Sequence, residues 1–201
     1  MSFVRILSAA LVGGVVVFGW GYTSHEVLGT SKMAFKDMPT ASERAVVDAM
    51  QGAVKEHSAF LFPMPPDEEL SKEQWEAHLS RFEEGPRGMV IFDPTVMSGS
   101  FSKLLGTEFL SGTIAALMAA IVASSVRGGY WGRVSTVVIM GLFAWVSIDI
   151  SYWNWYRFPE GFALAGLVDQ GGGWLLAGLC MAGIARPRCC ASGACCQPAA
   201  A

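Results

Sequence analysis

Four long runs of hydrophobic residues divide this chain, and a polar stretch separates the first run from the second. The runs extend over Phe3–Val27, Leu104–Val126, Trp131–Trp153 and Gly161–Ala185. Each run is long enough for a helix to cross the hydrocarbon layer, which takes roughly 20 residues. A backbone in lipid must satisfy its own hydrogen bonds, so we interpret each run as a helix. The pattern predicts an all-α membrane protein with a bundle of four transmembrane helices.

The polar stretch at residues 29–103 has the composition of a small water-soluble domain. It holds 12 acidic and 8 basic residues, a net charge of 8 − 12 = −4. It is too long for a plain loop. Helix starts are indicated at Thr40, with Glu43 three residues on, and at Ser71, with Gln74 three residues on. Residues 58–63 and 88–94 have strand composition. We therefore expect a small α+β extramembrane domain at 29–103, between a first transmembrane helix (1–28) and helices two to four (104–186).

The composition agrees with this division and narrows the function. The chain is 52% hydrophobic and 15% charged, with a mean hydropathy of +0.41 and a net charge of −3. A soluble domain usually carries about 25% charged residues. These values exclude an ordinary soluble enzyme and a basic nucleic-acid binder. The polar domain contains no cysteine, no HExxH and no Gly-x-Ser-x-Gly motif. We expect no catalytic residues and no resident cofactor.

Lysine and arginine placement predicts the orientation in the membrane. Only Arg157 flanks one set of helix ends; the other set is flanked by Arg5, Arg127, Arg133, Arg186 and Arg188. This asymmetry puts both termini in the cytoplasm and residues 29–103 outside, which is the periplasm if the membrane is a bacterial inner membrane. No small-residue cleavage site follows the first run, so we interpret it as a retained anchor rather than a signal peptide.

A few ionisable or polar residues lie within the runs, all toward their predicted outer ends. Charges within membrane spans are costly and point to function by default. One hypothesis is a shared polar pocket, and the alternative is that Glu26, Glu108 and Asp149 are interfacial and touch water or the outer domain. Asp169 lies deepest, and we expect it to be buried and hydrogen-bonded. The set comprises His25, Glu26, Glu108, Asp149, Asp169 and Gln170.

Small residues within the runs predict where helices approach closely. Gly112, Ala116 and Ala120 recur every four residues in the second run. Gly171, Gly172 and Gly173 follow Asp169 in the fourth. Three consecutive glycines either allow tight packing or weaken the helix locally, as in transporters with broken helices.

A cysteine-rich tail occupies residues 187–201. Cys189, Cys190, Cys195 and Cys196 could bind zinc or copper(I) through four soft ligands. The alternatives are a flexible, disordered tail without fixed function and, in a eukaryote, palmitoylation.

Three stretches carry a resemblance to a known group of proteins: 17–25 (VFGWGYTSH), 85–88 (GPRG), and Asp169-Gln170 ahead of 173–178 (GWLLAG). In these, the chain resembles uncharacterised small bacterial inner-membrane proteins. The resemblance implies four spans with an outer insertion between spans one and two, and it brings no activity. Our first hypothesis is a non-enzymatic accessory or scaffolding component that contacts the lipid bilayer and other membrane-protein subunits. The second is a small transporter or proton-coupled carrier around Asp169, and the third is metal handling by the tail.

Overall fold

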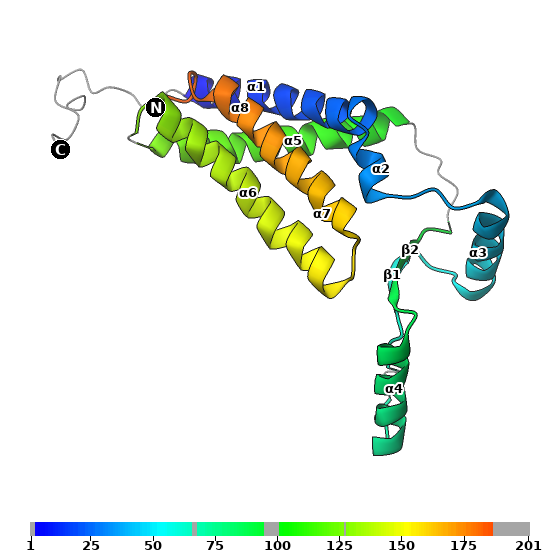
Figure 1. The fold of residues 1–201 in the computed structure, drawn as a ribbon. Coiled ribbons are helices and arrows are strands. Elements are labelled where there is room, and N and C mark those ends of the chain that lie inside the picture. Colours follow the sequence, from blue (N-terminus) through cyan, green and yellow to red (C-terminus); the bar gives the residue numbers. More distant parts are fainter. Residues whose placement is uncertain (1–2, 66–67, 95–100, 127, 187–201) are drawn as a thin grey trace, which may run out of the picture. The chain divides into compact units, whose positions relative to one another are not determined.

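The computed structural model is mostly helical and describes residues 3–65, 68–94, 101–126 and 128–186. The chain forms two compact units (Figure 1). The first comprises residues 1–35, 99–153 and 158–201, and contains the long helices. The second comprises residues 36–98 and 154–157. Each unit is described by itself.

Among the described residues, three helices are long and apolar enough to cross a membrane, as a multi-pass membrane protein requires. The first is α1 (Phe3–Tyr22) continued by a π-helical segment, η1 (Thr23–Val27). The second is α5 (Phe101–Ser125), and the third is α6 (Tyr130–Trp155). They coincide with the first three hydrophobic runs, which confirms that the sequence pattern located these three helices.

The fourth hydrophobic run is also helical, but it changes its hydrogen-bonding pattern midway. It consists of α7 (Glu160–Leu167), a second π-helical segment η2 (Val168–Gly172) and α8 (Gly173–Met181). Asp169, Gln170 and three consecutive glycines interrupt its apolar composition. It is not one of the three helices that length and hydropathy identify among the described residues. The fourth crossing therefore stays a prediction.

Small side chains hold α1 against α5 and α8. A Cβ added at Gly14 would lie 2.8 Å from the Cα of Thr113, and one at Gly13 would lie 2.9 Å from the Cβ of Ala116. The backbones of α1 and α5 can lie this close only because these positions lack side chains. The buried core around these contacts is correspondingly built from small residues, and its largest members are Val137 and Met181. Its other members are all alanines: Ala9, Ala116, Ala119, Ala120, Ala123, Ala177 and Ala185.

Side chains of α6 donate hydrogen bonds to backbone carbonyls of the fourth run. Trp145 Nε1 donates to the carbonyl of Ala163 at 2.8 Å, and the Tyr130 hydroxyl donates to that of Leu179 at 2.7 Å. Arg133 Nε donates at 2.9 Å to Ala182, the residue that caps the C-terminus of α8. Arg133 is only 7% exposed. Its buried charge is compensated by the carbonyl of Ala182, at the negative end of the α8 dipole, and by the carbonyl of Gly128, to which Nη1 donates at 3.1 Å.

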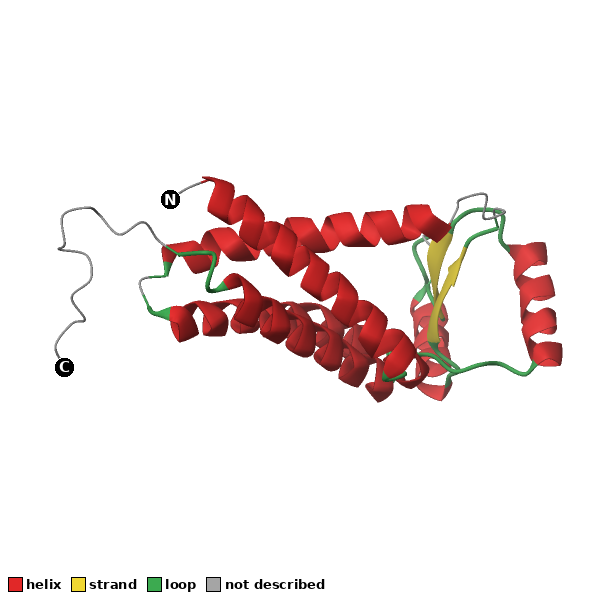
Figure 2. Ribbon diagram, turned by 90° about the horizontal axis from the view of Figure 1, so that it is seen from above, coloured by secondary structure: helices red, strands yellow, loops and turns green. Residues whose placement is uncertain are grey.

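The described residues of the second unit form two helices and two strands. It contains α3 (Thr40–Ala53), β1 (Ser58–Phe62), α4 (Lys72–Glu84) and β2 (Gly88–Phe92). The strands pair antiparallel (Figure 2). In this register, Ser58 lies opposite Phe92. Both predicted strands are thus confirmed. No residue of α3 or α4 is buried, so the two helices add no core of their own. The short helix α2 (Thr30–Ala34) belongs to the first unit.

The two predicted helix starts have different outcomes. Ser71 forms the predicted capping box with Gln74: the Gln74 N–H donates to Ser71 Oγ at 3.3 Å, and the Ser71 N–H donates to Gln74 Oε1 at 2.8 Å. The prediction of Thr40 as a cap is wrong. The first bond of α3 runs from the Glu43 N–H to the carbonyl of Pro39, which makes Pro39 the N-cap and Thr40 the first helical residue. Proline has no side-chain acceptor, so this end carries no side-chain cap.

Candidate intramembrane polar site

Two π-helical segments, η1 and η2, contact each other through their side chains. Such segments are rare inside helices and occur frequently at functional sites. In η1, the hydroxyls of Thr23 and Ser24 donate to the carbonyls of Gly19 and Gly21, at 2.9 and 3.2 Å. Hydroxyls that bond to preceding carbonyls compete with the helical ladder. In η2, Gly171 and Gly172 lower the helix propensity.

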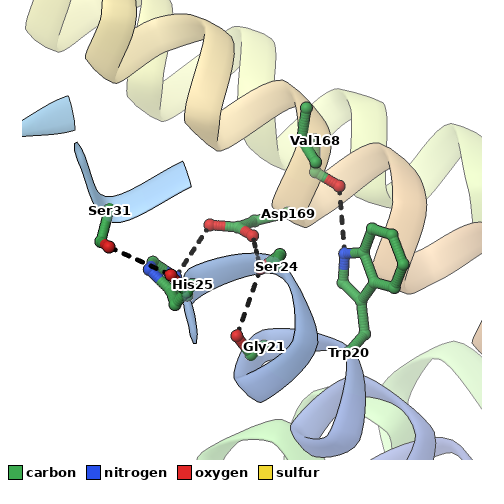
Figure 3. A network of polar contacts seen from close by, with 7 residues as sticks. All are labelled: Trp20, Gly21, Ser24, His25, Ser31, Val168 and Asp169. Carbon is green, nitrogen blue, oxygen red and sulfur yellow. Dashed lines mark hydrogen bonds and ion pairs between the residues drawn. The ribbon is translucent and has the colours of Figure 1, made fainter. Parts of the chain in front are cut away.

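The carboxylate of Asp169 on η2 connects to both Ser24 and His25 on η1 (Figure 3). The Ser24 hydroxyl shares its single hydrogen between Oδ1 and the carbonyl of Gly21, and His25 Nε2 lies 3.0 Å from Oδ2. Ser24 is fully buried, whereas the side chains of Asp169 and His25 are 23% and 46% exposed. The contact with His25 is an ion pair when the imidazole is protonated, and a hydrogen bond from a neutral imidazole to the carboxylate when Nε2 carries its only proton.

Trp20 fixes the backbone next to this carboxylate. Its Nε1 donates to the carbonyl of Val168 at 3.1 Å, and its ring covers Gly172 and Gly173. A Cβ at Gly172 would lie 2.5 Å from Trp20 Cζ2, and one at Gly173 would lie 3.1 Å from Cδ1. A Cβ at Gly171 would meet only Leu167 and Leu142, at ordinary distances of 3.7 and 3.8 Å. Close packing therefore depends on the second and third of the three predicted glycines.

The other predicted site residues lie in different surroundings. Glu26 is exposed on η1. Asp149 is half-buried on α6, and its carboxylate faces α7, where a Cβ at Gly166 would lie 2.8 Å from Asp149 Cγ. Sequence reasoning missed Ser24, which precedes His25 directly but carries no charge to mark it. The structure thus brings His25 and Asp169 into direct contact and adds Ser24 as a second partner of Asp169, but it does not gather all six residues.

Glu108 and Gln170 line a groove of about 390 Å³ between α5 and α6. Val17 of α1 and Trp174 of α8 also line it. Gln170 Oε1 accepts a hydrogen bond from Trp174 Nε1 at 2.9 Å. The α5 wall carries Glu108, Ser111, Gly112, Ala115, Met118 and Ala119, and the α6 wall carries Met140 and Ala144.

The small residues predicted for packing on α5 mostly face α1. Ala116 and Ala120 are fully buried. Gly112 is less constrained, because a Cβ there would meet only Val17 Cγ1, at 3.9 Å. The next row of small residues, which includes Ser111 and Ala115, faces the groove instead.

No group of three or more histidine, cysteine or acidic side chains that could hold a metal occurs in the described part of the chain. The predicted metal ligands Cys189, Cys190, Cys195 and Cys196 lie outside the described residues. The zinc or copper hypothesis for the tail therefore stays a prediction.

Comparisons with known proteins add no relative to this picture. No family model, no curated protein and no solved structure matches the chain.

Proposed function

We propose that this chain is a non-enzymatic accessory or scaffolding component of a membrane complex. The observation that carries the proposal is the open groove between α5 and α6. Ala116 and Ala120 of α5 are buried in the core with α1, but Ser111 and Ala115 face the groove. Rows of small residues let another helix approach closely. No helix of the described residues covers the second row, which Ser111 and Ala115 form along the groove. An uncovered row of this kind suits a subunit that docks onto another membrane protein.

In this proposal the chain crosses the membrane four times, with α7, η2 and α8 as the last crossing. These 22 consecutive residues span about 33 Å at a rise of 1.5 Å per residue, close to the thickness of the hydrocarbon layer. Both termini lie in the cytoplasm and residues 29–103 lie outside, in the periplasm of a bacterium. A fluorescent protein fused after Ala201 should then be bright and protected from an external protease. A fusion that the protease removes from intact cells contradicts the fourth crossing.

The scaffold proposal is tested by filling the groove. Ala115→Trp places an indole in the groove, whereas Leu110→Trp, on a face of α5 that does not line it, is the matched control. In mild detergent, we expect the wild type and Leu110→Trp to co-purify with a stoichiometric membrane protein, and Ala115→Trp to lose it. A wild-type protein that always migrates as a single chain contradicts the proposal.

A second candidate, a proton-coupled carrier, is favoured by the Asp169–His25 contact between two π-helical segments. Both groups can exchange a proton, and such intramembrane pairs mark proton pathways. In proteoliposomes with an internal pH dye, carrier function requires a proton flux that Asp169→Asn abolishes and that Glu26→Gln, at an exposed position on η1, leaves intact. The absence of any proton flux in the wild type, with a range of candidate solutes, excludes this function.

A further inference from the structure

We propose that the groove binds a transmembrane helix of a different protein, and that this helix places a lysine or arginine against Glu108. The inference rests on the proposed accessory function and adds the chemistry of the partner. The first observation concerns the carboxylate of Glu108. Among the residues that the structure describes, none forms a hydrogen bond or ion pair with the side chain of Glu108. A charged group in a membrane span is stable when it pairs.

The shape of the groove favours a helix as the occupant. Its α5 wall runs from Glu108 to Ala119, about 16 Å or three helical turns. Gly112 and Ala115 on this wall, with Ala144 opposite, are small enough for a backbone to come close. Glu108 and Gln170 both line the groove, so a helix seated there contacts small apolar residues over most of its length and meets polar groups as well.

A second copy of this chain does not supply the missing charge. On the three long apolar helices, Arg5 lies near the N-terminus of α1, and Arg133 already donates to the carbonyls of Ala182 and Gly128. Lys103 lies in the first turn of α5, about 7.5 Å along the axis from Glu108. Its ammonium would have to reach deeper into the membrane, opposite to the direction in which lysine side chains extend.

An exposed stripe of α6 does not supply a cation either. Ile139, Phe143 and Val146 are 64%, 71% and 54% exposed, and all three are uncharged. A copy of α6 in the groove would leave Glu108 unpaired. Charge complementarity therefore favours a different chain that carries its own cation.

The experiment uses the full-length protein in its native membranes, with a photoreactive diazirine analogue at single positions. Met118 lines the groove, is 56% exposed and is close to the analogue in size. Leu110 is 60% exposed, does not line the groove and is the matched control. We expect one discrete protein adduct from position 118 and diffuse lipid labelling from position 110. The cross-linked peptide, identified by mass spectrometry, should be a transmembrane segment with a lysine or arginine within two turns of the adduct.

Charge variants then test the pair. Glu108→Lys should lower the yield of the adduct at least about tenfold, which corresponds to about 1.4 kcal/mol, and Glu108→Gln should lower it less. Exchanging the partner's basic residue for glutamate should restore the yield with Glu108→Lys. An adduct with a helix that has no basic residue, or a yield that Glu108→Lys does not change, overturns the inference and leaves the scaffold proposal standing. Adducts only with lipid or with a second copy overturn the inference as well. The scaffold proposal fails separately, if the detergent-solubilised protein carries no partner at all.

Discussion

Gly172 offers a sharp test of the packing between η2 and α1. A Cβ at this position would lie 2.5 Å from Cζ2 and 2.8 Å from Cε2 of Trp20, well inside van der Waals contact. Gly172→Ala therefore forces the indole ring to turn away. Because the ring is held by the bond from Nε1 to the carbonyl of Val168, turning it breaks that bond as well.

The expected loss of stability has two parts. Overpacking a well-fitted contact costs about 1–3 kcal/mol, and losing a hydrogen bond costs about 1 kcal/mol. The alanine regains up to about 1 kcal/mol of helix propensity. We expect a net destabilisation of about 1–3 kcal/mol for Gly172→Ala. The neighbouring Gly171→Ala is the matched control, because its Cβ would meet Leu167 and Leu142 only at 3.7 and 3.8 Å.

Thermal unfolding in detergent measures the difference between the two variants. Gly172→Ala should unfold at a lower temperature than the wild type, and Gly171→Ala at the same or a higher one. The environment of Trp20 should change only in the first variant, which a variant series lacking the other tryptophans can report by fluorescence. Equal destabilisation by the two substitutions, or a larger effect at Gly171, would refute the packing of Trp20 over Gly172.

Three further substitutions test other contacts. Arg133→Met removes the donor to the C-terminal carbonyl of Ala182, and we expect a loss of about 1–3 kcal/mol in unfolding in detergent; an unchanged midpoint contradicts the role of this bond. Gly14→Ala should destabilise the protein because its Cβ would meet backbone of α5, whereas Gly21→Ala, with nothing within 4 Å, should not; the reverse order is the contrary result. Ser71→Ala should cost α4 about 1 kcal/mol, seen as faster hydrogen exchange in its first turn, and unchanged exchange would show that the capping box is unimportant.

The elements that the sequence predicted well are those encoded locally. The hydrophobic runs located α1, α5 and α6, because helix length in a membrane is set by the thickness of the hydrocarbon layer. The capping box at Ser71 was also visible, since its two partners lie three residues apart. The prediction of Thr40 as a cap was wrong because Pro39 occupies the N-cap position, which makes Thr40 the first helical residue.

The site depends on contacts that no local pattern encodes. Asp169 stood out as a lone charge in an apolar run, but its partner Ser24 lies 145 positions away in the sequence. Serine occurs commonly in membrane helices, so nothing in its neighbourhood marks it. Glu26 was grouped with His25 because the two are adjacent, yet they differ in role. His25 contacts Asp169 across the helices, whereas Glu26 is exposed.

Two neighbouring residues of η2, Asp169 and Gln170, have different surroundings, although the sequence had suggested one shared pocket for both. Asp169 faces η1 of the same chain, while Gln170, the next residue, faces the groove with Glu108. If Asp169 joins helices within the chain and Glu108 binds a partner, then Asp169→Asn should lower the unfolding temperature in detergent and leave co-purification of the partner intact. Glu108→Gln should weaken co-purification and leave the unfolding temperature of the isolated chain unchanged. Should both variants lose stability and partner together, the two carboxylates belong to a single pocket, and the division that η2 makes between internal packing and docking is wrong.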